Sequence, residues 1–191
     1  DSSLADTPRA ISAAGKAIEE TSELTYDERR SILKDAADHW DWSTEEKEYL
    51  AKMLGSPLKS LDFKLGQGQD TLEYLPLRTD AEKTTYAGDI AEKKGPGMYE
   101  VYKNIEEPLS AFLPANDPSV APYVLGFTAL TGNTAVVRPS SEEAYSTLKT
   151  AEALTEAGYP DGALNVILYD SSDESNEAHR QNMIDGTRGA I

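Results

Sequence analysis

The sequence of 191 residues contains no cysteine and only two histidines. Without cysteine, these residues form no disulfide, hold no thiolate-bound metal and supply no thiolate nucleophile. His39 and His179 stand in polar stretches without a partner at ligand spacing, so we predict no metal site. The first residues are polar and acidic, and no apolar run is long enough to span a bilayer. These absences predict a cytoplasmic protein that has no membrane partner.

Basic residues are also scarce. The chain has 18 Lys and Arg against 34 Asp and Glu, a net charge of -16 at pH 7. Contacts to phosphates depend on Lys and Arg, so this balance argues against nucleic acid and anionic membranes as partners. The acidic residues are dispersed along the chain, as on a surface that stays hydrated in concentrated salt. We therefore expect a halophilic source.

The first third of the chain has the capping and periodicity of short amphipathic helices. Thr7 followed by Pro8 is expected to cap a first helix and occupy its first turn. Two further helix starts have the spacing of capping boxes, Thr25 with Glu28 and Ser43 with Glu46. The third helix is expected to stop at Gly55. After it, residues 58–65 suggest a helix that Gly66 and Gly68 are expected to interrupt.

The character of the chain changes after residue 104. Alternation in Met98 to Asn104 favours a strand that extends or edges a sheet. Buried strands are then predicted at 109–113, 134–137 and 164–168, and helices at 119–130, from Ser141 to the stop at Gly158, and at 173–182. This order predicts a parallel sheet, in which ligands bind at the carboxyl ends of the strands.

Four segments at and between these strand ends carry a resemblance to a known family. Residues 107–118 end in Pro-Ala-Asn-Asp-Pro, and residues 130–140 read Leu-Thr-Gly-Asn-Thr-Ala-Val-Val-Arg-Pro-Ser. Segments 151–160 and 162–166 follow in matching order and spacing. Together they resemble the aldehyde dehydrogenase superfamily, which uses NAD or NADP. Residues 7–104 are similar to the family's helical lead-in with less detail.

The resemblance implies an α/β fold: a helical lead-in followed by a Rossmann-like parallel sheet with helices on both faces. Residues 1–104 are expected to form the lead-in and an oligomerisation-type strand of the same domain. Residues 105–191 are expected to form the first part of the cofactor-binding core, with the catalytic domain absent from this chain.

The resemblance also implies roles for individual residues. Asn116 matches the asparagine whose side-chain amide helps to stabilise the oxyanion of the tetrahedral intermediate. Cofactor-binding residues are expected at the ends of the first two strands: Phe112, Leu113, Pro114, Ala115, Asn116, Arg138, Ser140 and Ser141. Structural alternatives stay open: Asn116 suits a turn, Arg138 a surface, and both serines a helix start.

Two departures from the family pattern affect the expected cofactor. Ser141 stands where many members have a glutamate that binds both ribose hydroxyls, and Arg138 stands where the family has lysine. Loss of a carboxylate and gain of a guanidinium favour tolerance of a 2′-phosphate, and hence of NADP. The loop starting at Tyr169 lacks the family's glycines, which predicts weaker cofactor binding.

The function implied is oxidation of an aldehyde to a carboxylic acid with NAD or NADP, by an enzyme that is a homo-oligomer when intact. The sequence begins with Asp1 rather than Met and stops before the family's nucleophilic cysteine and general-base glutamate. We therefore expect a portion of a longer enzyme that is inactive alone. The alternative is a truncated or degenerate homologue that acts as a non-catalytic binding or scaffolding module.

Overall fold

The computed structural model describes residues 2–81, 106–169 and 175–190. The helices before the sheet are α1 (Asp6–Glu23), α2 (Tyr26–His39), α3 (Thr44–Met53) and α4 (Leu58–Ala81). The later elements alternate between strand and helix: β1 (Leu109–Phe112), α5 (Val120–Leu130), β2 (Ala135–Arg138), α6 (Ala144–Glu156), β3 (Leu164–Val166), α7 (Asn176–Asp185) and β4 (Gly189–Ala190).

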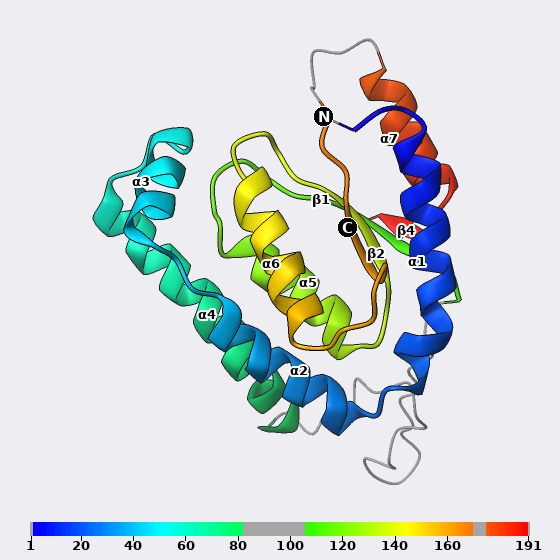
Figure 1. Ribbon diagram of the computed structural model, residues 1–191, viewed down its shortest axis with the longest axis horizontal. Helices are drawn as coiled ribbons and strands as arrows, with labels where there is room; N and C mark the ends of the chain where they lie inside the picture. The colour runs from blue at the N-terminus through cyan, green and yellow to red at the C-terminus, as the bar shows by residue number, and fades with distance from the viewer. Residues whose placement is uncertain (1, 82–105, 170–174, 191) are drawn as a thin grey trace, which may run out of the picture.

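The strands form one parallel sheet in the order β3-β2-β1-β4. Leu109 of β1 is in register with Ala135 of β2 on one side and Gly189 of β4 on the other. Two crossovers through helices place β1, β2 and β3 side by side, as parallel strands require. The predicted fold class is confirmed: a helical lead-in precedes a parallel sheet with helices on both faces (Figure 1). The predicted strand at Met98 to Asn104 lies outside the described residues.

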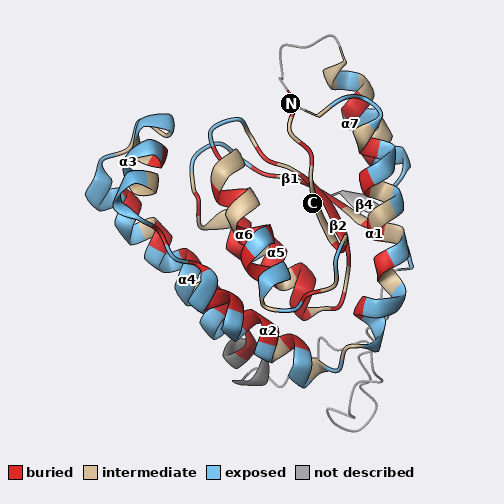
Figure 2. Cartoon of the chain, in the orientation of Figure 1, coloured by how far each residue is buried: buried red, intermediate tan, exposed pale blue. Residues whose placement is uncertain are grey.

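The two faces of the sheet are covered unequally. Helices α5 and α6 pack on one face and are backed by α2 and α4, and we call this the α5–α6 side (Figure 1). Helices α1 and α7 cover the other face, which we call the α1–α7 side. Figure 2 shows that buried residues concentrate between the sheet and the surrounding helices. The sheet is therefore the middle layer, and the side with two helical layers contains most of the core.

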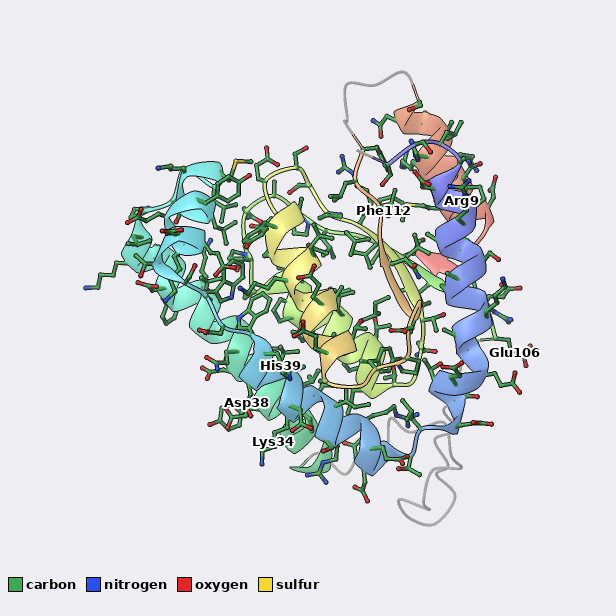
Figure 3. All side chains as sticks on the ribbon, viewed as in Figure 1. Arg9, Lys34, Asp38, His39, Glu106 and Phe112 are labelled. Carbon is green, nitrogen blue, oxygen red and sulfur yellow. The ribbon has the colours of Figure 1, made fainter. Side chains whose placement is uncertain are left out.

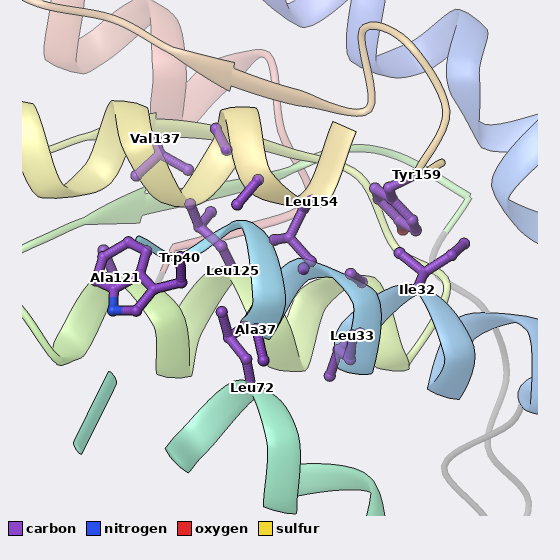
Figure 4. Packing of buried hydrophobic residues seen from close by; sticks show 14 of the residues in the cluster. Ile32, Leu33, Ala37, Trp40, Leu72, Ala121, Leu125, Val137, Leu154 and Tyr159 are labelled. Atoms are coloured by element: carbon purple, nitrogen blue, oxygen red, sulfur yellow. The ribbon is translucent and has the colours of Figure 1, made fainter. Parts of the chain in front are cut away.

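The larger core lies on the α5–α6 side. Its fully buried members include Leu33, Leu125, Val137 and Leu154, with Trp40 and Leu72 around them (Figure 4). The core on the α1–α7 side is small and consists of Ala10, Ala14, Val136, Ile167, Tyr169 and Met183. Val136 and Val137 are neighbours on β2 and point to opposite faces, as successive strand residues do.

Both predicted capping boxes are confirmed. The hydroxyls of Thr25 and Ser43 accept from the backbone N–H of Glu28 and Glu46, respectively. In each box the glutamate carboxylate accepts in turn from the backbone N–H of the cap residue. The predicted cap at Thr7 is wrong. The N-cap residue of α1 is Ala5 and the helix begins at Asp6, so Thr7 lies inside the first turn. Thr7 is fully buried, and its hydroxyl is hydrogen-bonded to the His179 side chain.

The predicted interruption of α4 is also wrong, because the helix runs through Gly66 and Gly68. A Cβ at Gly68 would lie 3.0 Å from Cγ of Pro122 and 3.3 Å from the indole of Trp40. Gly68 therefore permits close approach of α5 and the end of α2 rather than ending the helix. Nothing lies within 4 Å of a Cβ at Gly66. Gly55, with a φ of 58°, ends α3 as expected.

A polar network connects α3 to α6 on the α5–α6 side. The carboxylate of Glu46 accepts from the Tyr145 hydroxyl at 2.7 Å and from Nζ of Lys149 at 2.6 Å. The hydrogen bond from Lys149 is the main cause that lowers the pKa of Glu46 to about 2, against the opposing effect of burial. The ring of Trp42 contacts Tyr145 edge to face and lies 4.8 Å from Nζ of Lys149. The network fixes α3 against the sheet-covering layer.

Among residues 2–81, 106–169 and 175–190, no helix has both the length and the apolar character needed to cross a membrane. The outer face of α2 is polar, where Lys34, Asp38 and His39 lie along the helix (Figure 3).

Candidate functional site

The carboxyl ends of β1, β2 and β3 lie at one edge of the sheet, because the strands are parallel. At this edge Phe112 is in register with Arg138, and the N–H of Leu113 donates to the carbonyl of Arg138 at 2.9 Å. Phe112 packs against the small core of the α1–α7 side, toward α1 and α7 (Figure 3), whereas Leu113 is buried in the larger core. The structure thus places three of the predicted site residues beside one another.

The loop after β1 is exposed at Pro114, Ala115 and Asn116. Its backbone is nevertheless fixed at two points. Nζ of Lys64, on α4, donates to the backbone carbonyl of Asn116 at 2.6 Å. The carboxylate of Asp117 accepts from both the N–H and the hydroxyl of Ser119, at 3.0 and 2.7 Å. An exposed asparagine on a held backbone is suited to presenting its amide to a ligand.

The loop after β2 lies against the loop after β1. The hydroxyl of Ser140 donates to the carbonyl of Pro114 at 3.4 Å and accepts from the N–H of Glu143 at 3.3 Å. The predicted helix start at Ser141 is wrong by three residues, because residues 141–143 form a turn and α6 begins at Ala144. Ser140 therefore has the structural, cap-like role that the sequence left open, while Ser141 is exposed.

A buried carboxyl beneath this loop was missed by sequence reasoning. Glu143 is only 2% exposed, and its Oε2 accepts from the Ser146 hydroxyl at 2.8 Å. Its Oε1 has no hydrogen-bond partner in the structure. Burial raises the pKa of Glu143, and the negative charge of Asp117 adds to this effect. The Ser140-x-x-Glu143 spacing was the available signal, since it matches the capping-box pattern used for α2 and α3.

A stack of side chains stands at the end of β3. The ring of Tyr169 lies 4.4 Å from the imidazole of His179, with 7° between their planes. The guanidinium carbon of Arg138 lies 5.0 Å from the centre of the same phenol ring. Behind the imidazole, Nδ1 of His179 is hydrogen-bonded to the Thr7 hydroxyl at 2.7 Å. We call Arg138, Tyr169 and His179 the Arg138 stack.

The stack corrects the interpretation of His179. We expected polar surroundings from its sequence neighbours, but the residue is 1% exposed between α1 and α7. Tyr169 is 7% exposed, and burial raises the pKa of its hydroxyl while the charge of Arg138 partly offsets this rise. No local signal predicts these contacts, because Thr7 and His179 are 172 residues apart in the sequence.

Within the part of the chain that the structure describes, no group of three His, Asp or Glu side chains is arranged to hold a metal ion. Among the described residues, the sheet edge carries the guanidinium of Arg138, serine hydroxyls, the amide of Asn116, backbone groups, and the carboxyls of Asp117 and Glu143.

Residues 1–186 match the family model described as the aldehyde dehydrogenase family. The chain belongs to the aldehyde dehydrogenase family. One relative in this family, "Succinate-semialdehyde dehydrogenase [NADP(+)] 2" of Schizosaccharomyces pombe, is 32% identical over 183 residues, which cover 92% of this chain and 35% of the relative. A glutarate-semialdehyde dehydrogenase of Pseudomonas aeruginosa is 28% identical over 179 residues, or 91% of this chain and 36% of the relative.

The fold of this aldehyde dehydrogenase family chain also matches solved structures. The NADP-dependent glyceraldehyde-3-phosphate dehydrogenase from Bacillus halodurans, complexed with NADP, superposes with a TM-score of 0.72 at 20% identity. The match covers 98% of this chain and 44% of that one. At this identity the similarity establishes the fold alone. The chain spans about a third of the length of the curated relatives that it matches.

Proposed function

We propose that this chain forms the NAD(P)-binding portion of an aldehyde dehydrogenase that oxidises an aldehyde to a carboxylic acid. The observation that supports the proposal best is the sheet edge itself. The family resemblance implied cofactor-binding residues in two separate segments, Phe112 to Asn116 and Arg138 to Ser141. In the structure these segments lie side by side at the carboxyl ends of β1 and β2, the end of a parallel sheet where ligands bind.

The residues at this edge fit the adenosine-ribose side of such a cofactor. Arg138 offers N–H donors at the strand end, and Ser140 and Ser141 offer hydroxyls without a carboxylate at either position. The backbone of Leu113, Pro114 and Ala115 is proposed to line the nicotinamide-ribose side. When bound, NAD or NADP would accept the hydride that leaves the aldehyde carbon.

Asn116 is proposed to donate its side-chain amide to the oxyanion of the aldehyde adduct. The hydrogen bond from Lys64 to the Asn116 carbonyl would keep that amide in place, because it fixes the backbone while the side chain stays exposed. The 191 residues contain no cysteine, so they hold the stabilising group for the intermediate without the thiolate that forms it. Five further points remain predictions: an aldehyde substrate, homo-oligomeric assembly, the domain division at residue 104, a cytoplasmic location and a halophilic source.

The second candidate is a truncated or degenerate non-catalytic homologue that acts as a binding or scaffolding module. We favour the aldehyde dehydrogenase proposal, because Asn116, to which the resemblance gives an oxyanion-stabilising role, is exposed on a backbone that Lys64 holds.

Calorimetric titration of the chain with NAD and NADP tests the proposal. We expect saturable binding of at least one cofactor, and its loss in Ala115→Trp, because an indole at this exposed position would fill the end of β1. Thr155→Trp places the same ring on the exposed far end of α6 and should leave binding unchanged. Absence of binding at millimolar cofactor, or equal loss in both variants, would contradict the proposal.

A further inference from the structure

The Arg138 stack connects the sheet edge to the small core of the α1–α7 side. Its members come from the end of β2, the residue stretch after β3, and α7, and Thr7 of α1 completes the chain of contacts. Thr7 is fully buried and His179 is 1% exposed, so the inner end of the stack is fixed by packing. The outer end, Arg138, is only partly buried at the strand edge.

Tyr169 has one face covered by the imidazole of His179, so the guanidinium of Arg138 uses the other face. Stacking occupies the flat face of the Arg138 guanidinium, and one of its N–H groups also donates to the Tyr169 hydroxyl. The remaining N–H donors can point outward in the plane of the group. Those donors are arranged as a fork that matches two oxygens of a phosphate. A stacked arginine at this edge is therefore already oriented for a phosphate ester.

The stack also limits where Arg138 can move. A free arginine side chain has several rotatable bonds, and fixing them on binding reduces affinity. The ring of Tyr169 restricts them before any ligand arrives. A small residue at position 169 would leave the guanidinium to sample other directions.

We propose that Tyr169 is a positioning residue that holds Arg138 for a phosphate on the adenosine ribose, and that the chain consequently prefers adenosine 2′-phosphates to unphosphorylated adenosine ribose. The inference rests on the proposed cofactor binding and adds its specificity. The ligand class is an adenosine nucleotide with a 2′-phosphomonoester, as in NADP.

Two charged residues near the stack make it possible to distinguish a phosphate held by Arg138 from a phosphate attracted by the overall positive charge nearby. Arg180 and Glu177, on α7, both act on the Tyr169 hydroxyl, and they pair with each other at 3.4 Å. Arg180 is thus a second cation near the stack that is not stacked on the ring. It serves as the matched control for Arg138.

The experiment is calorimetric titration of the 191-residue chain with adenosine 2′,5′-bisphosphate and with 5′-AMP. We expect the bisphosphate to bind roughly tenfold to a hundredfold more tightly than 5′-AMP, as charge-assisted hydrogen bonds to a fork provide. Tyr169→Leu should reduce that ratio by about fivefold to tenfold and leave 5′-AMP affinity nearly unchanged. Tyr169→Phe keeps the ring face but removes the hydroxyl that accepts from Arg138, so it should reduce the ratio less than Tyr169→Leu does.

The variants of the two arginines complete the test. Arg138→Gln should bring the ratio close to one, and Arg180→Gln should leave it as in the parent chain. Equal weakening of both ligands by Tyr169→Leu would overturn the proposal and make the stack a structural element only. An Arg180→Gln effect as large as that of Arg138→Gln would also overturn it, because attraction would then come from the general field.

Two outcomes separate this proposal from the function on which it rests. Binding of 5′-AMP without any preference for the bisphosphate would overturn the specificity while retaining the cofactor site. Failure of both ligands and both cofactors to bind would remove the cofactor site as well. If Tyr169→Leu does not fold by circular dichroism, Tyr169→Met replaces it, since methionine keeps apolar bulk without a ring face.

Discussion

The two sides of the sheet differ in how they are built. On the α5–α6 side, two layers of helices enclose a core that extends from Leu33 to Leu154. On the α1–α7 side, one layer of two helices covers a hydrophobic cluster of six described residues, two of them alanine. Stability is therefore concentrated on one side, whereas the Arg138 stack belongs to the other.

This difference shows how a small layer can still determine ligand chemistry. On the α5–α6 side, Lys64 of α4 holds the loop after β1, and Ser140 joins that loop to the loop after β2. The α1–α7 side provides Tyr169 and His179, whose rings are buried and stacked in a defined geometry. Substitutions on the α5–α6 side are expected to change mainly the free energy of unfolding. Substitutions in the Arg138 stack on the α1–α7 side are expected to change mainly the ligand preference.

The largest expected effect compares adjacent residues on β2. Val137→Ala removes two methyl groups from the core of the α5–α6 side, and Val136→Ala removes the same groups from the core of the α1–α7 side. Both residues are 0% exposed. We expect a loss of about 2 to 3 kcal/mol for Val137→Ala and about 1 to 2 kcal/mol for Val136→Ala, because a thin layer collapses more readily around a cavity. Urea unfolding measures both. Equal losses would mean that the two sides are equally rigid.

The next effect concerns the polar network that joins α3 to α6 on the α5–α6 side. The pKa of Glu46 is lowered from 4.5 to about 2, so its stabilising contribution is present above pH 4.5 and disappears as the pH falls toward 2. Glu46→Gln should lose roughly 2 kcal/mol at pH 7, and the difference from the parent chain should shrink below pH 4.5. Unfolding free energy measured from pH 7 to pH 3 tests this. Glu45→Gln, an exposed neighbour, is the control and should show little pH-dependent difference.

A smaller effect distinguishes the two glycines of α4. Gly66→Ala should stabilise the chain by about 0.5 to 1 kcal/mol through helix propensity, since its Cβ would meet nothing. Gly68→Ala introduces the same propensity but requires Pro122 and Trp40 to move, so the gain should be absent or reversed. Thermal unfolding of the two variants compares them directly. Equal stabilisation would show that the packing around Gly68 adapts freely.

The smallest effect lies at the site edge. Ser140→Ala removes a hydroxyl that accepts at 3.3 Å from Glu143 and donates at 3.4 Å to Pro114. We expect a loss of about 0.5 kcal/mol, the lower end for a cap-like bond, whereas Ser141→Ala at an exposed position should be neutral. Chemical denaturation resolves this only as a difference between the two variants. A larger loss in Ser141→Ala would invert the assignment of the structural serine.

The predictions from sequence succeeded where the signal is local. The capping boxes at Thr25 and Ser43 depend on residues three positions apart, and their geometry is as the spacing requires. The parallel sheet was predicted from the alternation of strand and helix, and its parallel strands place Phe112 beside Arg138 at one edge. The ligand roles of the site residues stay predictions.

The errors arose where distant parts of the chain decide a residue's environment. Gly68 looked like a helix breaker because Trp40 and Pro122, which need the space, are 28 and 54 positions away by their numbers. His179 was expected in polar surroundings because its neighbours in sequence are polar, yet it is 1% exposed on α7 and hydrogen-bonds to Thr7 of α1. Thr7 looked like a cap, but its hydroxyl partner was His179. Local pattern carries no information about such contacts.

The amino-terminal stretch has a practical consequence for handling the protein. The N–H of Ser2 donates to the carbonyl of Leu168, and the Ser2 hydroxyl accepts from the Leu168 N–H at 3.1 Å, so this stretch lies beside the end of β3 (Figure 1). An affinity tag or surface linker joined there would emerge next to Tyr169 and crowd the very edge that ligand titrations are meant to probe. Immobilisation through an exposed position on the outer face of α2, such as Lys34, would keep that edge open.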